Sequence, residues 1–497
     1  MSETPMTYAP TWDSVSTHPL PDWYDDAKIG VFVHWGLYSV PAWAPRVGDI
    51  QAMLMQGGPA GLMRENPYAE WYLNSQQVPG SPTSIHHRQT YGQGFPYDGF
   101  VETFDRESAR ADLDALAALC KAGGARYVVL TTKHHDGFTL WPSAQVHPKK
   151  GVYQARRDLV GDLAASVRAQ DMRMGLYYSG GFDWPWNDAV LTGIASMAYA
   201  MPADPAYAAY AAAHVRELID RYQPSILWND ISWPAGDSLP RLFAEYYNAV
   251  PDGVINDRWS QKTAPHNAVA EGAMRVIGGA IQRGWRFLPA GRRALSMPAV
   301  RHCDVTTPEY AQHAEIMPRK WESTRGIGHS FGVNLNEQPQ DILTTGELVR
   351  MVADIVSKNG NLLIGIGPLA DGTIPAMQQV PVRGLGDWLA VNGEAIYGTR
   401  PWAVASGKTS AGDDIRFTKK DGDLFVLFLD GPATRELTLP VELAGGEPLS
   451  AELLGTGAIE ATVADSGRIA LHLPDRLPVS PVHVVRLRSS GTFVPHG

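Results

Sequence analysis

Residues 107–133, ESARADLDALAALCKAGGARYVVLTTK, contain the unit that decides the fold. The first half, Glu107–Cys120, has apolar residues at helical spacing, and the Gly123-Gly124 pair that follows is typical of a helix end. The second half, Arg126–Lys133, is a short run of apolar and β-branched residues that predicts a strand buried on both faces. A helix that leads directly into such a strand predicts a parallel sheet covered by helices.

The same alternation continues along most of the chain. About seven or eight such units before residue 395 predict an α/β fold of the (β/α)8 barrel type. A doubly wound open sheet is the competing fold, but it needs a glycine-rich phosphate turn where this chain has His34-Trp35-Gly36-Leu37-Tyr38. The other strands that we expect are Lys28–Trp35, Arg173–Ser179, Ser225–Asp230, Gly253–Asp257 and Asn361–Gly367, and the helices are Asp158–Ala169, Ala206–Tyr222, Leu239–Ala249 and Thr345–Lys358.

The pattern changes near residue 400, where short strands separated by Gly, Pro and Asp replace the helices. Asp413–Asp430 predicts a hairpin with Asp421-Gly422 as its turn. We therefore expect two domains, a (β/α)8-like catalytic domain over residues 1–398 and a C-terminal all-β sandwich over residues 399–497.

Composition and charge exclude several function classes. The net charge is −10 without a basic block, which argues against nucleic acid or an anionic membrane as partner. Two cysteines cannot form a disulfide framework or a four-thiolate zinc site. The polar stretch Met1–Pro10 does not resemble a secretory signal, and no run of about 18 apolar residues occurs, so we expect a cytoplasmic protein.

Polar and aromatic residues follow the expected strands at their carboxyl ends. Because barrel enzymes place their active sites at this face, these residues predict one polar cavity with aromatic walls. The strand-end groups are His34-Trp35, Lys133-His134-His135-Asp136, Tyr177-Tyr178, Trp228-Asn229-Asp230 and Asn256-Asp257-Arg258-Trp259.

Two kinds of chemistry could use such a cavity. A metal hydrolase is disfavoured, because barrel metal sites often use two histidines separated by one residue, whereas the adjacent His134 and His135 face opposite sides of a regular strand. We therefore expect neither a metal nor another cofactor. Glycoside hydrolysis needs one ionised and one protonated carboxyl group. Asp230, which closes the apolar strand SILWND, suits the ionised role, but spacing alone does not rank Glu70, Glu309 and Glu322 as the acid.

Several motifs resemble the α-L-fucosidases of glycoside hydrolase family twenty-nine. The match extends over about residues 18 to 400, and its most specific motif is KHHDGF at Lys133–Phe138. The matching stretches, in the order of the family, are Trp23–Trp43, Glu70-Trp71-Tyr72, Tyr127–Ser143, Tyr222–Pro234, Asn256–Trp259, Thr307–Tyr310, Trp321-Glu322 and Lys358–Pro368.

The resemblance implies a retaining exo-glycosidase that releases terminal α-L-fucosyl residues from glycoconjugates or oligosaccharides by double displacement. Asp230 matches the nucleophile, and Glu322 matches one placement of the acid/base, with Glu70 as second choice and Glu309 as third. The expected partner is a fucoside, and the chain could also form a homo-oligomer. The residues expected to bind the sugar are His34, Glu70, Trp71, His134, His135, Tyr177, Trp228 and Arg258.

Three features depart from the family pattern. Phe331 and Val333 in GHSFGVN replace aromatic residues that the family usually carries, Gly365 replaces an Asn, and residues 259–303 resemble an insertion on the catalytic face. These departures leave two alternatives open, namely a glycosidase of the same mechanism for a related sugar, and a catalytically inactive carbohydrate-binding protein.

Overall fold

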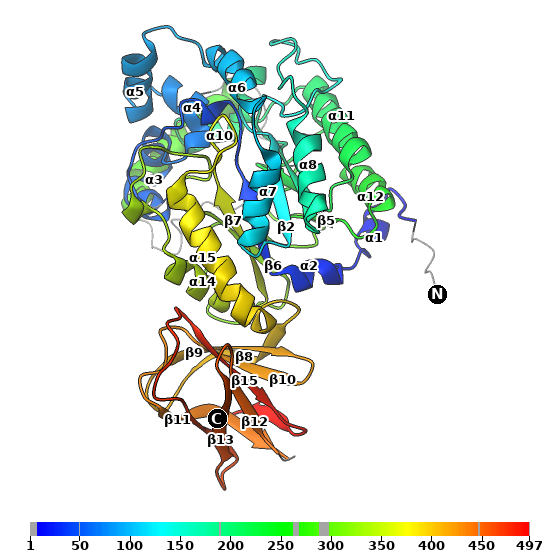
Figure 1. Ribbon diagram of the computed structural model, residues 1–497. Helices are drawn as coiled ribbons and strands as arrows, with labels where there is room; N and C mark the ends of the chain where they lie inside the picture. Colours follow the sequence, from blue (N-terminus) through cyan, green and yellow to red (C-terminus); the bar gives the residue numbers. More distant parts are fainter. Residues whose placement is uncertain are drawn as a thin grey trace.

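The computed structural model of the chain describes residues 7–48, 50–187, 190–261, 268–287, 298–445 and 448–496 (Figure 1). A parallel sheet surrounded by helices occupies the upper part of the molecule in this view, and an antiparallel sheet lies below it. No helix within these ranges is long and apolar enough to cross a membrane.

The parallel sheet has seven strands in the order β5-β4-β3-β2-β1-β7-β6, and neighbouring strands run parallel throughout. Almost every residue of these strands is buried, which is why they read as continuous apolar runs in the sequence. The strands are β1 (Ile29–Val33), β2 (Tyr127–Lys133), β3 (Arg173–Ser179), β4 (Ile226–Asp230), β5 (Val254–Ile255), β6 (Trp321–Gly326) and β7 (Gly360–Ile366).

An irregular segment, residues 304–310, joins the two edges of this sheet. The amides of Asp304 and Val305 donate to the carbonyl of Ile255 on β5. On its other side, the segment forms parallel bridges to β6 through the pairs Thr306–Trp321 and Glu309–Thr324. The segment therefore occupies the eighth position of the ring, and the predicted fold of the (β/α)8 barrel type is confirmed.

Helices surround the parallel sheet, and most of the predicted ones are present. One expectation needs correction: the helix predicted over Glu107–Cys120 is two helices, because Asp112 interrupts it and caps the second one by accepting from the amide of Ala115. The helices are α1 (Trp12–Val15), α2 (Asp22–Ala27), α3 (Ile50–Arg64), α4 (Tyr72–Gln77), α5 (Pro82–Tyr91), α6 (Phe100–Ser108), α7 (Leu113–Ala122), α8 (Leu159–Ala169), α9 (Trp184–Asn187), α10 (Ile194–Ala200), α11 (Pro205–Tyr222), α12 (Leu239–Ala249), α13 (Ala268–Gly284), α14 (Thr345–Ser357) and α15 (Ala376–Asn392).

Residues 400–495 form one nine-stranded antiparallel sheet, so the predicted all-β module is confirmed. The sheet curls until the strands at its two edges, β16 and β8, contact each other around an apolar core. The hairpin turn at Asp421-Gly422 lies where it was predicted, and both residues have positive φ. The strands are β8 (Arg400–Lys408), β9 (Asp414–Lys420), β10 (Asp423–Phe428), β11 (Glu436–Ala444), β12 (Ser450–Leu453), β13 (Gly457–Val463), β14 (Arg468–His472), β15 (His483–Arg488) and β16 (Thr492–Pro495).

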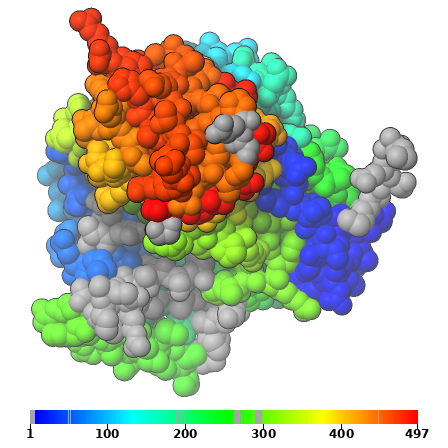
Figure 2. All heavy atoms as spheres, turned by 90° about the horizontal axis from the view of Figure 1, so that it is seen from below, coloured from blue at the N-terminus to red at the C-terminus, as the bar shows by residue number. Residues whose placement is uncertain are grey.

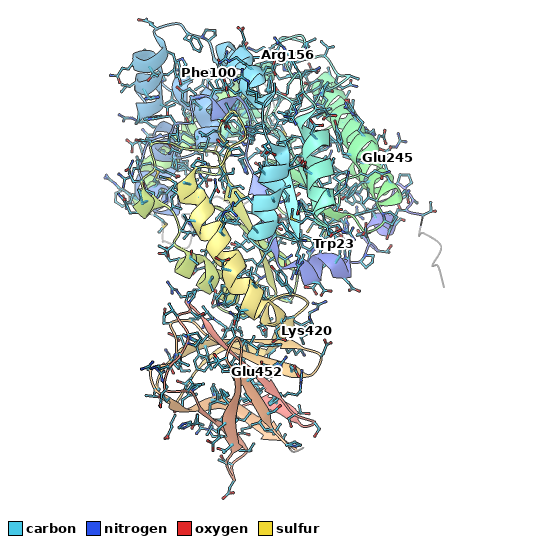
Figure 3. The ribbon with its side chains drawn as sticks, viewed as in Figure 1. Trp23, Phe100, Arg156, Glu245, Lys420 and Glu452 are labelled. Carbon is cyan, nitrogen blue, oxygen red and sulfur yellow. The ribbon has the colours of Figure 1, made fainter. Side chains whose placement is uncertain are left out.

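The antiparallel sheet packs against the amino end of the parallel barrel. Arg400 at the start of β8 forms ion pairs with Asp25 and Asp26 of α2, the helix that precedes β1. Lys420 lies at the junction in Figure 3, where Nζ donates to the carbonyl of Tyr397. Seen from below, the orange and red atoms of the antiparallel sheet cover part of the barrel (Figure 2). The carboxyl ends of the parallel strands therefore lie on the face away from this sheet.

Candidate active site

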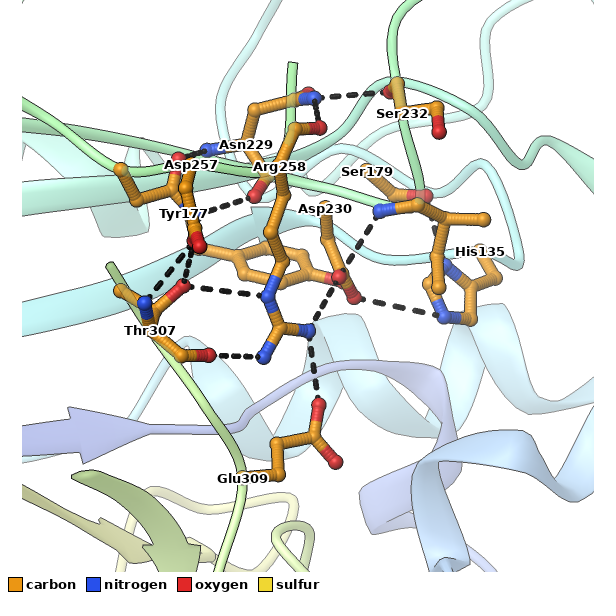
Figure 4. A network of polar contacts seen from close by, with 12 residues as sticks. His135, Tyr177, Ser179, Asn229, Asp230, Ser232, Asp257, Arg258, Thr307 and Glu309 are labelled. Atoms are coloured by element: carbon orange, nitrogen blue, oxygen red, sulfur yellow. Dashed lines mark hydrogen bonds and ion pairs between the residues drawn. The ribbon is translucent and has the colours of Figure 1, made fainter. Parts of the chain in front are cut away.

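Asp230, the last residue of β4, is the centre of a polar network at the carboxyl end of the barrel (Figure 4). Its Oδ1 accepts hydrogen bonds from Arg258 Nη1 at 2.9 Å and from the amide of Ile231 at 2.9 Å. Its Oδ2 accepts from the Tyr177 hydroxyl at 2.9 Å and lies 3.9 Å from His135 Nε2. Donors at both oxygens are the surroundings that an ionised carboxylate requires.

Arg258 connects Asp230 to a second carboxylate, Glu309. The same Nη1 atom that donates to Asp230 Oδ1 donates to Glu309 Oε1 at 2.8 Å. The two carboxylate oxygens can therefore be no more than about 5.7 Å apart, the length of the two contacts end to end. Retaining glycosidases separate their two carboxyl groups by about 5–5.5 Å. Both groups retain some exposure to solvent, because 11% of the Asp230 side chain and 35% of the Glu309 side chain are exposed.

The irregular segment 304–310 places Glu309 and holds Arg258. The Thr307 carbonyl accepts from Arg258 Nη2 at 2.8 Å, and the Thr307 hydroxyl lies 3.3 Å from Arg258 Nε. Thr307 is fixed in turn by Asp257, whose Oδ1 accepts from the Thr307 amide and hydroxyl. The guanidinium also lies 4.7 Å from the centre of the Trp228 ring. These contacts leave the guanidinium a single orientation between the two carboxylates.

The turn after Asp230 has an unusual backbone. Ile231 and Ser232 both have positive φ, which is uncommon for residues other than glycine and is rarest for β-branched ones. The turn is held by the Asp230 carbonyl, which accepts from the amides of Gly180 and Gly181 at 3.2 Å each. A Cβ at Gly181 would lie 1.6 Å from the Ile231 carbonyl oxygen, so only glycine allows this close approach.

Three buried histidines lie near Asp230 and Tyr177. Burial and the nearby His135 lower the pKa of His34 to about 3. Burial also lowers the pKa values of His134 and His135 well below the ordinary value. At neutral pH each ring therefore has one donor and one acceptor nitrogen. Nδ1 of His34 and Nδ1 of His134 are buried and have no hydrogen-bond partner among the described residues.

Aromatic rings pack around these histidines and Tyr177. Tyr177 stacks on Trp228 with their ring centres 5.4 Å apart, and Trp71 meets the His135 ring edge-on at 5.3 Å. Phe331 lies 4.9 Å from His34, so this departure from the family pattern is part of the cavity wall. A Cβ at Gly365 would lie 2.9 Å from the Phe331 ring. The two departures are therefore neighbours, and the small residue at position 365 makes room for the ring at position 331.

Glu70 lies at the side of this cavity and holds the loop that carries Phe331. Its Oε2 accepts from the Gly332 amide at 2.8 Å and from the Ser330 hydroxyl at 3.1 Å. The side chain is buried, and burial raises the pKa of Glu70 to about 7. Of the predicted acids, Glu70 is thus the one that anchors a loop.

Glu322 lies at the opposite end of the barrel. It is the second residue of β6, and its Oε2 accepts from the hydroxyls of Tyr24 and Tyr127. Tyr127 is the first residue of β2, and Tyr24 belongs to α2, which precedes β1, so both mark the amino end of the sheet. Asp230 is at the carboxyl end of β4, and the structure therefore does not bring Glu322, the first choice for the acid/base, to Asp230.

The structure thus joins most of the predicted site residues. Asp230, Arg258, Tyr177, Trp228, Trp71 and the three histidines form one contact network, which Glu309 joins through Arg258. Thr307, Asp257 and Ser179 were not predicted, although each lies within the quoted motifs or ends a predicted strand. Among the described residues, no group of three or more His, Cys, Asp or Glu side chains could hold a metal ion.

Comparison with known proteins identifies the family. A family model described as Alpha-L-fucosidase matches residues 1–285 and 293–394 of this chain. The chain belongs to the alpha-L-fucosidase family. It is 31% identical over 485 residues to the plasma alpha-L-fucosidase of Rattus norvegicus, an alignment that covers 95% of this chain and 91% of that protein. This confirms the resemblance drawn from the motifs and makes the chain a glycoside hydrolase.

Solved structures of a bacterial alpha-L-fucosidase are also similar. The Thermotoga maritima alpha-fucosidase in complex with a mechanism-based inhibitor is 38% identical with a TM-score of 0.79, and the match covers 97% of this chain and 99% of that one. The complex of the same enzyme with fucose is 37% identical, with a TM-score of 0.79 and coverage of 97% and 100%. Family members thus share the whole architecture of this chain, including the antiparallel sheet.

Proposed function

We propose that this alpha-L-fucosidase family member hydrolyses terminal α-L-fucosides with retention, with Asp230 as the nucleophile and Glu309 as the acid/base. One observation carries the assignment of the pair: Arg258 Nη1 donates to both carboxylates, at 2.9 and 2.8 Å. The shared donor keeps these two oxygens within about 5.7 Å of each other, which supports a pair that acts by double displacement.

In the first step, an Asp230 oxygen attacks the anomeric carbon while Glu309 donates a proton to the glycosidic oxygen. The C–O bond to the leaving group breaks, and a covalent glycosyl-enzyme forms. In the second step, Glu309 removes a proton from a water molecule, which attacks the same carbon and releases Asp230. The partly exposed position of Glu309 suits both roles, because the leaving group and the water arrive from the solvent side.

The remaining groups of the cavity bind the sugar and stabilise charge. Arg258 and Tyr177 hold the Asp230 carboxylate in one orientation, which reduces the rearrangement needed for attack. The neutral histidines offer both donors and acceptors to hydroxyl groups, and Trp71, Trp228 and Phe331 offer apolar surface to the C–H face and the methyl group of a 6-deoxy sugar.

The test is the release of nitrophenol from 4-nitrophenyl α-L-fucoside by the wild type and by Asp230→Gly, with and without azide. We expect turnover by the wild type, loss of several orders of magnitude in the variant, and recovery when azide takes the place of the carboxylate. A wild type that cleaves other aryl glycosides but not this one would overturn the sugar assignment. An active Asp230→Gly variant without azide would overturn the nucleophile assignment.

We also propose the division into a catalytic domain, residues 1–398, and a C-terminal domain, residues 399–497. The change from a parallel to an antiparallel sheet at Arg400 supports it. Limited proteolysis that cuts first near residue 398 would agree with this boundary, whereas first cuts within either sheet would contradict it.

A further inference from the structure

His135 faces the nucleophile with one ring nitrogen, and the state of that nitrogen matters for substrate binding. Nε2 lies 3.9 Å from Asp230 Oδ2. Burial, together with the charges of Lys133 and Arg258, lowers the pKa of His135 well below its ordinary value, so the ring is neutral. A neutral imidazole carries a proton on one nitrogen and a lone pair on the other, and the partner of one nitrogen decides the role of the other.

The partner of the other nitrogen is Ser179, the last residue of β3. The buried Ser179 hydroxyl oxygen lies 2.7 Å from His135 Nδ1 and 2.9 Å from the carbonyl oxygen of Phe182. A hydroxyl group has a single proton, and a carbonyl can only accept. Both contacts are hydrogen bonds in one arrangement only, in which Ser179 donates to the Phe182 carbonyl and His135 Nδ1–H donates to Ser179 Oγ.

We propose that Ser179 is a positioning residue that holds His135 as the Nδ1–H tautomer, so that Nε2 accepts a hydrogen bond from a hydroxyl of the sugar bound beside Asp230. The inference rests on the proposed function, because it describes how the site binds a hydroxyl of the fucoside. In this tautomer Nε2 carries the lone pair, so a sugar hydroxyl close to both Nε2 and Asp230 Oδ2 can donate its proton to His135.

A buried ion pair fixes the loop that contains Phe182, whose carbonyl accepts the hydrogen bond from Ser179. Lys133 Nζ donates to Asp183 Oδ2 at 3.1 Å and to the Phe182 carbonyl at 3.3 Å, so this carbonyl is held from two sides. Two residues after Phe182, the amide of Trp184 donates to the carbonyl of His135 at 2.8 Å. The backbone on both sides of the imidazole is therefore held in place.

Aromatic packing prevents the ring from turning over. Trp71, Phe182 and Trp184 each meet the His135 ring edge-on, with ring centres 5.3 Å apart in every case. Turning the ring by half a rotation would place a carbon atom against Ser179 Oγ. Packing therefore selects the ring orientation, and Ser179 selects the proton position.

The first test compares Ser179→Ala and Ser179→Thr with the matched control Ser357→Ala. Ser357 is also fully buried, and its hydroxyl donates to the Asp354 carbonyl at 2.8 Å in helix α14, away from the cavity. We expect Ser179→Ala to lower kcat/KM for 4-nitrophenyl α-L-fucoside by about 10- to 100-fold, the range seen when a partner that orients a histidine is removed. Threonine keeps the hydroxyl and should restore most of the activity, and the control should change it by less than about twofold. Full activity of Ser179→Ala would overturn the proposal.

The second test separates positioning from a merely structural role. Aryl fucosides with fluorine in place of the 2-, 3- or 4-hydroxyl can accept but not donate a hydrogen bond. For the hydroxyl that donates to His135, the rate ratio of parent to fluoro substrate should be about tenfold smaller in Ser179→Ala than in the wild type, and the electronic effect of fluorine cancels in this comparison. If the ratio at each of the three positions were the same in Ser179→Ala as in the wild type, the proposal would be overturned.

The third test needs no turnover. In protein labelled with 15N-histidine, the signal of His135 is identified by its loss in His135→Gln, and its 15N shifts report which nitrogen carries the proton. We expect Nδ1–H in the wild type and a mixture of tautomers in Ser179→Ala. An Nε2–H signal in the wild type overturns the proposal, whether or not the protein cleaves fucosides. A wild type without fucosidase activity overturns the proposed function instead.

Discussion

Both ends of the parallel barrel hold a buried carboxylate that accepts hydrogen bonds from tyrosine. At the carboxyl end, Asp230 accepts from Tyr177 and from Arg258. Arg258 also donates to a second carboxylate, that of Glu309. At the amino end, Glu322 accepts from Tyr24 and Tyr127. The residue types are similar, but only the carboxyl end pairs two acids and leaves them partly exposed.

This difference supports the separate roles proposed for the carboxylates at the two ends. Glu322 is 1% exposed, and burial raises its pKa, although both tyrosine hydroxyls oppose this effect. A carboxyl group in that position can keep a proton but cannot pass it to a substrate, because no substrate oxygen reaches it. Burial and a raised pKa are therefore insufficient evidence for an acid/base, and the position along the strand has to be considered as well.

The largest expected contrast between the two ends is in turnover. Glu309→Gln should lower kcat by about 10²- to 10⁴-fold, because amide nitrogen cannot deliver the proton to the leaving group. Glu322→Gln should lower kcat by less than about tenfold, since it touches no reacting atom. Initial rates on an alkyl α-L-fucoside, whose leaving group needs the proton more than nitrophenol does, provide the measurement. Equal losses in the two variants would remove the distinction between the two ends.

The order of the two positions should reverse when the free energy of unfolding is measured, with the larger loss at Glu322. Glu322→Ala removes the shared acceptor of two buried tyrosine hydroxyls, which also hydrogen-bond to each other, and should cost about 1–3 kcal/mol. Glu309→Ala should cost less than about 1 kcal/mol, because the side chain is 35% exposed. Thermal melting of both variants tests this prediction. If Tyr24→Phe combined with Tyr127→Phe did not reduce the penalty of Glu322→Ala, the unsatisfied hydroxyls would not be its cause.

A smaller effect is expected from the wall of the cavity. Gly365→Ala places a Cβ against the Phe331 ring and should shift that ring toward His34, raising KM for the fucoside by about tenfold, equivalent to about 1.4 kcal/mol. Phe331→Leu in the same background should relieve the contact and lower KM again. An unchanged KM in Gly365→Ala would show that position 365 does not shape the binding cavity.

A pH dependence of stability should originate at the amino end. Burial and the neighbouring Lys320 lower the pKa of Lys28 from 10.5 to about 7. Between these values the folded protein binds fewer protons than the unfolded chain, so stability should rise with pH from about 7 to 10.5. Lys28→Met should remove this rise, which amounts to at most about 1.4 kcal/mol per pH unit. Melting temperatures of both proteins across this window provide the comparison, and parallel curves would contradict it.

Sequence reasoning predicted which strand-end residues come together, because parallel strands place their carboxyl ends at one edge of the sheet. His34, His135, Asp230 and Arg258 follow different strands, yet a single topological rule places them together. Glu322 was expected from the family resemblance instead, and no strand was predicted around it. Residues 321–326 form β6, so Glu322 begins a strand rather than ending one.

Glu309 was the third choice for the acid/base, and no strand was predicted for its segment. Residues 304–310 hydrogen-bond to β5 on one side and to β6 on the other, and both partners are distant in sequence. Their positions depend on closure of the barrel, which no local pattern reports. Ser179 was missed for a different reason, since a serine at a strand end carries no signal until its histidine partner is in place.

The antiparallel sheet docks on the amino end of the barrel, through contacts such as those of Arg400 with Asp25 and Asp26. A chain attached to a bead or an electrode through this sheet would present its cavity to the liquid rather than to the support. Immobilised enzyme prepared in this way should hydrolyse long glycan chains as readily as short ones, whereas random attachment through lysine would hinder the long chains.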